Sequence, residues 1–526
     1  MSAALLPLFV GLPMIFAGIL AVTPTRRHIH VIVMMAVIAA STAGGILLIL
    51  DFLDGGAIAH GVGGWVAGIA IPFAADMFTA LMLAVTGILT LTCAWFAVAS
   101  GRAQSRFFAP MLLVLLAGVN GALLTADLFN LFVFIEVMLL PSYGLFLLAA
   151  PDRAPIRRIA GVRLYVTLNL LTSTVFLVGV GFLYGTAGTV NIAELSGLAA
   201  SDETVAIATA VCLFALGIKA AVVPVHGWLA RAYPTTSPAI TALFSGLHTK
   251  IAIFAIYRIY AVVFDGDPRF LWIGIAVFTV TMIVGALGAA GENSSRSMLA
   301  FNMVSGIGYI LLGVALFTPL GLVAGIFYLI HHMIVKASLF LSTGAVEVRY
   351  GTDKLGAFRG VAKTEPLIAA AFFVAALSLA GLPPFSGFVA KLSLILAAQD
   401  AGEIVAVVVM ILVSLVTLLA MLRIWSGMFW GSRSSEAASS LDAESADEES
   451  ADAASVAGSG TGTAGATDTL TRTRPRIGAS LAAPAIVLAV ITLGLGLGAE
   501  LLLGLAQIAA DGLLDTSAYV EAVLGS

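Results

Sequence analysis

Charged residues are scarce in this sequence. They make up 10% of the 526 residues, whereas an average soluble domain contains about 25%. Hydrophobic residues account for 60%, mean hydropathy is +1.08, and 25 basic residues nearly balance 29 acidic ones, for a formal net charge of −4. This composition excludes a soluble enzyme, a disordered hub and a nucleic-acid-binding protein with a basic face. It is typical of a protein that crosses a membrane many times.

Cysteine is also scarce. Cys93 and Cys212 both lie in apolar stretches, and the sequence has no CxxC motif or Cys/His spacing that suits a metal or an iron–sulfur cluster. We therefore expect no cofactor, no metal and no redox centre.

The first 25 residues lack the basic start of a cleavable signal peptide, so we expect them to form a retained first span.

Long apolar stretches are abundant. Each is about 20 residues, the length that crosses a bilayer as a helix, and each is continuous rather than alternating, which excludes a barrel. We predict an all-α polytopic membrane protein of about 14 transmembrane helices. The predicted spans are 4–22, 29–51, 76–100, 107–126, 128–150, 162–186, 205–231, 238–264, 270–290, 298–318, 321–346, 367–398, 404–430 and 482–510.

The basic residues assigned to loops predict the orientation. Nineteen of them, Arg296 included, follow odd-numbered spans, whereas Arg258 and Arg269 are assigned to loops after even-numbered spans. Cytoplasmic loops carry the excess of Lys and Arg, so both termini are predicted to be extracytoplasmic. Residues 434–475 are rich in Ser, Ala, Gly, Thr and acids, which predicts a disordered cytoplasmic linker. A tolerated insertion is favoured there over a regulatory segment.

Four lysines lie inside predicted spans: Lys219, Lys250, Lys336 and Lys391. One lysine at the centre of a membrane helix costs about 2.5–3.5 kcal/mol, so four cost on the order of 10–14 kcal/mol. Such residues persist only where partners or water compensate them. The default interpretation is a charge or proton pathway.

Glu136 is the acidic counterpart, in the middle of the fifth span. A pair formed by Glu136 and Lys219 across neighbouring helices can be ionised together, and loss of the partner lets the lysine release a proton. The alternative is a static salt bridge that fixes helix packing. The three further lysines favour the pathway.

Prolines predict two broken spans. Pro224 removes a backbone donor and should break the seventh span near 220–224, just after Lys219. In the twelfth span, Pro383, Pro384 and Gly387 are expected to do the same shortly before Lys391. Broken membrane helices are tolerated where they line a cavity, and transporter sites lie at such breaks.

Histidines accompany two of the lysines. His248 and Lys250 are two residues apart, so they should point to different faces of one helix. Tyr328, His332 and Lys336 are spaced i, i+4, i+8 and should line one stripe, where a histidine can relay protons.

Five other polar residues are weaker candidates. His331 lies about 100° off the stripe, so packing or hydrogen bonding fits it at least as well as relay. His226 could link the pathway to the cytoplasm or bond carbonyls freed at the break. Asp127 suits an interfacial position, Asp76 suits a helix N-terminus, and Glu500 suits a contact with a partner.

Several long motifs resemble one family. They are IKAAVVPVHGWLARAYPTTSPAITALFSGLHTKIAIFAIYR, FYLIHHMIVKASLFL and LAGLPPFSGFVAKL. Together they resemble the proton-pumping antiporter-like subunits of respiratory complex I and their Mrp antiporter relatives, over roughly residues 60–430. TADLFNLFVFIEVMLLPSYGLFLL and Lys391 look most like the D-type subunits of the Mrp branch. The acidic 434–475 insertion and the PTTSP turn at 234–238 depart from the family pattern.

The resemblance implies two inverted five-helix repeats. The implied divisions are an N-terminal region 1–106, a first repeat 107–264, a second repeat 265–430, the linker 431–480 and a last helix 481–526. Carried over by position, it also implies a regulating ion pair, two central Lys/His pairs and a terminal proton site. The regulating ion pair is Glu136 with Lys219. The two central pairs are Lys250 with His248 and Lys336 with His332, and the terminal proton site is Lys391.

The implied activity is proton conduction in a multisubunit Na⁺/H⁺ antiporter of a bacterial cell membrane, with subunits of types A, B, C, E, F and G as partners. One alternative is a subunit of a redox-driven pump, such as complex I or a membrane-bound hydrogenase. The other is a scaffold subunit with static charges. The sequence shows no cage of carboxylates and carbonyls for Na⁺, so the sodium path is left open.

Overall fold

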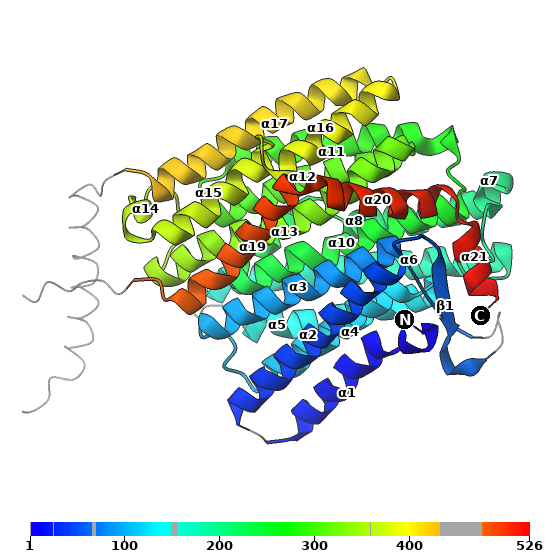
Figure 1. Cartoon of the computed structure of the whole chain (residues 1–526), viewed down its shortest axis with the longest axis horizontal. Coiled ribbons are helices and arrows are strands. Elements are labelled where there is room, and N and C mark those ends of the chain that lie inside the picture. The colour runs from blue at the N-terminus through cyan, green and yellow to red at the C-terminus, as the bar shows by residue number, and fades with distance from the viewer. Residues whose placement is uncertain are drawn as a thin grey trace, which may run out of the picture.

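The computed structural model is a bundle of helices that run broadly side by side (Figure 1). It describes residues 2–24, 26–65, 70–148, 155–357, 359–431 and 476–525. The predicted linker lies almost wholly outside these residues. The longer helices are α1 (Leu8–Val22), α2 (Arg27–Asp51), α3 (Met77–Ala99), α4 (Phe108–Leu124), α5 (Leu128–Leu148), α6 (Pro155–Ala187), α8 (Glu203–Lys219), α10 (Pro238–Val263), α11 (Leu271–Gly291), α12 (Ser295–Leu316), α13 (Pro319–Tyr350), α15 (Pro366–Ala380), α16 (Ser386–Asp400), α17 (Ile404–Ile424), α19 (Ala479–Leu497) and α20 (Ala499–Leu514).

The polytopic helical class is confirmed, whereas the number of spans is not. Eleven of the described helices are long and apolar enough to cross a membrane, or twelve if one bent pair is counted as a span. The seventh predicted span is α8 followed by the short α9 (Gly227–Ala232), and the twelfth is α15 followed by α16. The prediction of one helix over 482–510 is wrong, because α19 ends at Leu497 and α20 begins at Ala499.

A small hairpin was missed by the sequence prediction. Strands β1 (Ala57–Gly61) and β2 (Pro72–Asp76) pair antiparallel, with Ala57 opposite Asp76. Five-residue strands give almost no periodic signal beside apolar stretches four times longer. The C-terminal helix α21 (Ser517–Leu524) packs on both strands, next to the end of the bundle where both termini lie in Figure 1.

Helices α10 and α13 form the centre of the bundle. Every residue of α10 is buried, and α13 packs against α10, α12, α15, α16, α19 and α20. Both begin with a hydroxyl cap followed by proline: Ser237 Oγ accepts from the Ile240 N–H, and Thr318 Oγ1 accepts from the Gly321 N–H. A cap and a proline at the first helical position both favour a helix start. The two helices place Lys250 and Lys336 deep in the protein.

Two arginines assigned to loops lie buried instead. Arg258 is 3% exposed within α10, and its Nη2 lies 2.6 Å from Asp76 Oδ2. Asp76 also caps α3, as its position suggested. Arg296 is 5% exposed in the first turn of α12 and forms an ion pair with Glu347. An unpaired buried charge is costly, so each arginine is retained beside an acid from another element.

The α4–α5 and α11–α12 pairs pack through matching glycines. A Cβ added to Gly118 of α4 would lie 2.6 Å from the backbone nitrogen of Met138 on α5. Gly285 of α11 makes the same type of close contact with the backbone of Ser305 on α12. Gly285 lies 167 positions after Gly118, and Ser305 lies 167 positions after Met138. A second pair of contacts keeps this difference: Gly121 against Phe134, and Gly288 against Phe301.

Replacing Gly118 with alanine is expected to destabilise the protein by about 1–3 kcal/mol, because the new methyl group meets backbone rather than a movable side chain. Gly181→Ala on α6 is the matched control, since nothing lies within 4 Å of its added Cβ. The thermal unfolding midpoint of the purified protein in detergent measures both. Equal midpoints for the two variants would contradict close packing at Gly118.

Candidate functional site

The four lysines predicted inside spans are all buried. Lys219 ends α8, Lys250 lies on α10, Lys336 on α13 and Lys391 on α16, and their exposures are 2%, 0%, 0% and 4%. Among the described residues, their hydrogen bonds go to uncharged oxygens rather than to carboxylates. An uncharged oxygen accepts from an ammonium and from a neutral amine alike. Each lysine can therefore keep its contact in either protonation state.

Glu136 and Lys219, the predicted regulating pair, are not in direct contact in the structure. Lys219 Nζ donates to Asn169 Oδ1 of α6 at 3.2 Å. Glu136 is close enough to act electrostatically on Lys219, yet its buried Oε1 has no hydrogen-bond partner among the described residues. Asn169 was missed by the sequence analysis. An amide inside an otherwise apolar span was the available signal.

The predicted helix breaks are present. Helix α8 ends at Lys219 and α9 begins at Gly227; α15 ends at Ala380 and α16 begins at Ser386. At the first break, the carbonyl of Ile218 accepts from the Ala221 N–H and from Trp228 Nε1, each at 3.0 Å. At the second, Lys391 Nζ donates to the carbonyl of Ala380 at 3.0 Å.

The two breaks share a sequence pattern at a spacing of 160 residues. Ala220, Pro224 and Gly227 correspond to Ala380, Pro384 and Gly387, and residues 221 and 381 both have positive φ. In this alignment Lys219 corresponds to Leu379, and Lys391 corresponds to Arg231. The breaks therefore match, but their lysines lie on opposite sides of them.

His248 and Lys250 point in different directions, as predicted. His248 Nδ1 lies 2.8 Å from the hydroxyl of Tyr165 on α6, and His248 interacts electrostatically with Lys219. Lys250 instead interacts electrostatically with His332 and Lys336 of α13. Helix α10 thus faces the Lys219 region on one side and α13 on the other.

The stripe on α13 is buried and continuous. The ring centroids of Tyr328 and His332 are 6.1 Å apart, and neither ring nitrogen of His332 has a hydrogen-bond partner among the described residues. Lys336 Nζ donates to Asn302 Oδ1 of α12 at 2.6 Å. Asn302 is a second amide that the sequence analysis missed. Gly306 leaves room for the His332 ring, because an added Cβ would clash with it.

Contacts around Lys391 continue the line of buried polar side chains that runs from Lys219 through Lys250 and Lys336, here called the row, and they join α12, α13 and α16. Lys391 Nζ lies 5.4 Å from the ring centroid of Tyr309, which stacks on Tyr328 at 5.2 Å. His331 Nδ1 lies 2.9 Å from Ser386 Oγ, at the first residue of α16. The hydrogen-bonding interpretation of His331 therefore matches its position, and Tyr309 is a further residue that the sequence analysis did not identify.

The remaining candidates lie at the starts of helices. Asp127 Oδ1 accepts from the Asn130 N–H at 2.6 Å at the start of α5. Glu500 is exposed in the first turn of α20. His226 is partly buried at the break before α9, and its Nδ1 has no partner among the described residues.

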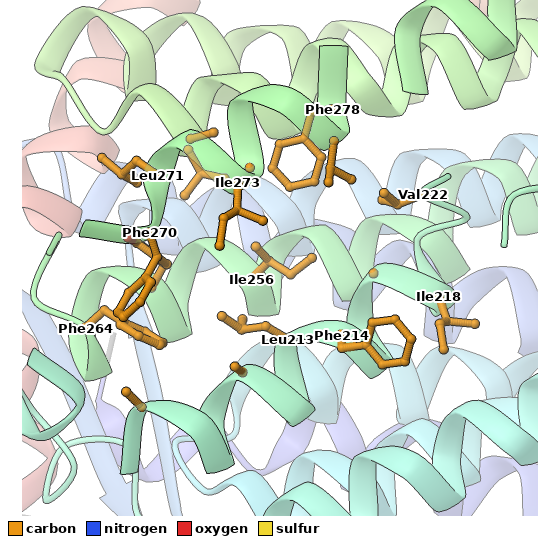
Figure 2. Close-up of a pocket in the computed structure, with 18 of the residues that line it drawn as sticks. Leu213, Phe214, Ile218, Val222, Ile256, Phe264, Phe270, Leu271, Ile273 and Phe278 are labelled. Carbon is orange, nitrogen blue, oxygen red and sulfur yellow. The ribbon is translucent and has the colours of Figure 1, made fainter. Parts of the chain in front are cut away.

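A hollow of about 640 Å³ lies beside the first break, between α8, α10, α11 and α12. Figure 2 shows apolar side chains pointing into it, among them Phe214, Ile256 and Phe278. None of the four buried lysines lines it. Within the described residues, no group of three or more His, Cys, Asp or Glu side chains is placed to hold a metal ion. The polar row is therefore embedded between helices and not in this hollow.

Comparisons with known proteins agree with this architecture. The family described as NADH:quinone oxidoreductase/Mrp antiporter, TM, matches residues 125–417. The D-type Na⁺/H⁺ antiporter subunit of Alkalihalophilus pseudofirmus is 35% identical over 438 residues, which cover 82% of this chain and 88% of that protein. The protein of the same name from Bacillus subtilis is 34% identical, covering 80% and 87%.

A solved structure gives the same result. A chain in the structure of the Mrp complex from Dietzia sp. DQ12-45-1b is 54% identical and superposes with a TM-score of 0.90 over 99% of both chains. The family match covers more than half of this sequence, and the curated relatives cover most of it. The chain therefore belongs to the family of NADH:quinone oxidoreductase and Mrp antiporter membrane subunits, within which it is similar to the D-type antiporter subunits.

Proposed function

We propose that this chain is the proton-conducting subunit of a multisubunit Na⁺/H⁺ antiporter and relays protons to drive Na⁺ efflux. One observation carries the proposal: a row of titratable side chains, half-buried at Glu136 and buried at every later member, connects the two halves of the protein. Successive groups interact electrostatically, except His248 and Lys250, which are two residues apart on α10. In order, the row is Glu136, Lys219, His248, Lys250, His332, Lys336 and Lys391.

Repulsion between neighbouring charges supplies the coupling. At an effective dielectric constant near 20, two unit charges 4 Å apart interact by about 4 kcal/mol. A proton that arrives on one lysine therefore disfavours a proton on the next. Because the lysines are held by neutral oxygens, a proton can leave without breaking an ion pair at each step. Glu136 acts at the start of the row, where its charge favours the protonated form of Lys219.

We further propose that residues 107–264 and 265–430 form two inverted repeats. The constant spacing of 167 residues in the glycine contacts and the shared pattern at the breaks support this division. Residues 1–106 and 481–526 flank the repeats. In this arrangement both termini face the outside, and the other subunits of the antiporter are the partners.

The test is to isolate the native complex from the membrane, identify its subunits by mass spectrometry and assay it in everted vesicles. We expect the six other Mrp-type subunits, and a proton gradient that collapses when Na⁺ is added. Co-purification with quinone-reductase and iron–sulfur subunits, without Na⁺-dependent collapse, would instead assign the chain to a redox-driven pump.

A further inference from the structure

We propose that Tyr165 and Ser142 form a hydrogen-bonded chain that fixes which nitrogen of His248 carries a proton, so that Nε2 is the atom that receives protons. The inference rests on the proposed proton relay and assigns a role to two residues outside the predicted row. Tyr165 is a positioning residue here, because it acts through His248.

The chain runs from α10 through α6 to α5. The hydroxyl of Tyr165 lies 2.8 Å from His248 Nδ1 and 3.0 Å from Ser142 Oγ. Ser142 Oγ donates to the carbonyl of Leu139 at 2.6 Å. All three side chains are buried, so water does not compete for these groups.

Counting protons gives the chain a direction. Serine and tyrosine each have a single hydroxyl proton. If Ser142 gives its proton to Leu139, it must accept from Tyr165. Tyr165 has then used its proton and must accept from His248, so Nδ1 carries a hydrogen. In a neutral imidazole the other nitrogen, Nε2, is then a bare acceptor.

The free nitrogen is the one the relay needs. His248 Nε2 is buried and has no hydrogen-bond partner among the described residues, and His248 interacts electrostatically with Lys219. When an ammonium on the row gives up a proton, an N–H bond breaks at the lysine and forms at Nε2. The imidazolium keeps its Nδ1–H bond to Tyr165, so the ring does not have to turn.

Packing holds the tyrosine ring independently of its hydroxyl. The Tyr165 ring stacks on Phe146 and Phe244, with centroids 5.4 Å and 5.7 Å away. Phe244 in turn lies 4.5 Å from the His248 ring. A phenylalanine at 165 therefore keeps the aromatic contacts and removes only the hydrogen bonds.

The second half of the protein holds a histidine, not a tyrosine, at the position that matches Tyr165. With the spacing of 167 residues, Tyr165 corresponds to His332 and Asn169 to Lys336. Both nitrogens of His332 lack hydrogen-bond partners among the described residues. The proposal therefore gives the two relay histidines different behaviour, with one fixed tautomer in the first half.

The experiment compares Tyr165→Phe with Tyr233→Phe in the whole complex. Tyr233 lies in the same aromatic cluster, but its hydroxyl donates only weakly, to the Phe244 carbonyl at 3.4 Å. We expect Tyr165→Phe to lower Na⁺-dependent proton flux in everted vesicles roughly 10- to 100-fold, by analogy with the loss of a group that orients a metal-bound histidine, and to change its pH profile. Tyr233→Phe should leave both unchanged.

A ¹⁵N NMR spectrum of histidine-labelled complex, with His248→Gln to assign the signal, tests the tautomer without transport. We expect protonated Nδ1 and bare Nε2 in the unmodified protein, and loss of this preference in Tyr165→Phe. A bare Nδ1 in the unmodified protein, or unchanged flux and pH profile in Tyr165→Phe, would overturn the inference. If unmodified vesicles show no Na⁺-dependent flux, the proposed function fails while the spectrum still decides the tautomer.

Discussion

Replacing Lys219 with alanine is expected to abolish Na⁺/H⁺ antiport in vesicles while the complex still assembles. The amino group links Glu136 to His248 in the proposed row, so its loss leaves no group to carry the proton between them. Assembly should survive, because the Lys219 hydrogen bond goes to the neutral amide of Asn169 and Glu136, which acts on Lys219 only through its charge, is half-buried. Glu136→Ala should have the same effect, through loss of the charge at the start of the row.

The matched control is Lys363→Ala, which removes an exposed lysine from the short helix α14 (Val361–Thr364). Its antiport should equal that of the unmodified protein. Subunit stoichiometry in purified complexes separates lost transport from lost assembly. Full activity in Lys219→Ala would disprove the role of this lysine, whereas loss of assembly without a separate transport defect would support the scaffold alternative.

Replacing Glu347 with alanine is expected to destabilise the protein by about 3–5 kcal/mol, because it leaves the buried guanidinium of Arg296 without its carboxylate. Arg296 also donates to the carbonyls of Pro234 and Thr236. It therefore joins the start of α12 and the end of α13 to the turn before α10. That turn is the PTTSP segment at residues 234–238.

Thermal unfolding in detergent, together with the amount of assembled complex in the membrane, measures this effect. The double variant Arg296→Met with Glu347→Leu is the control, since replacing both partners of a buried ion pair with apolar residues is often neutral or stabilising. We expect it to recover most of the lost stability. A single variant that melts with the unmodified protein would show that the ion pair contributes little.

Much of the fold follows from local sequence. Apolar stretches placed most helices within a few residues, and Pro224 and Pro384 located the two breaks. The errors arose because the search for apolar stretches of about 20 residues does not detect short elements or breaks within a stretch. This search cannot register a five-residue strand, and it extended the last span across the end of α19 at Leu497. Arg258 was assigned to a loop because its partner, Asp76, lies far away in the sequence.

The candidate site was predictable in its charged members but not in their partners. A lysine inside an apolar span is conspicuous because its burial is costly. The amides that hold two of them, Asn169 and Asn302, lie 50 and 34 residues away in the chain. No periodicity connects residues so far apart. For the same reason the sequence could pair Glu136 with Lys219 but could not predict the distance between them, which depends on how the helices pack.

The hydrogen bond from Lys391 to the Ala380 carbonyl ties a backbone irregularity to a side chain. That carbonyl is available because α15 ends at Ala380. The next residue, Gly381, has a φ of +89°, and a Cβ there would lie 2.7 Å from Cδ of Lys391. A substitution that straightened the helix would take away the acceptor, and a side chain at 381 would displace the lysine. We therefore expect Gly381, Pro384 and Lys391 to be conserved together, so that a related protein that lacks one of them should also lack the others.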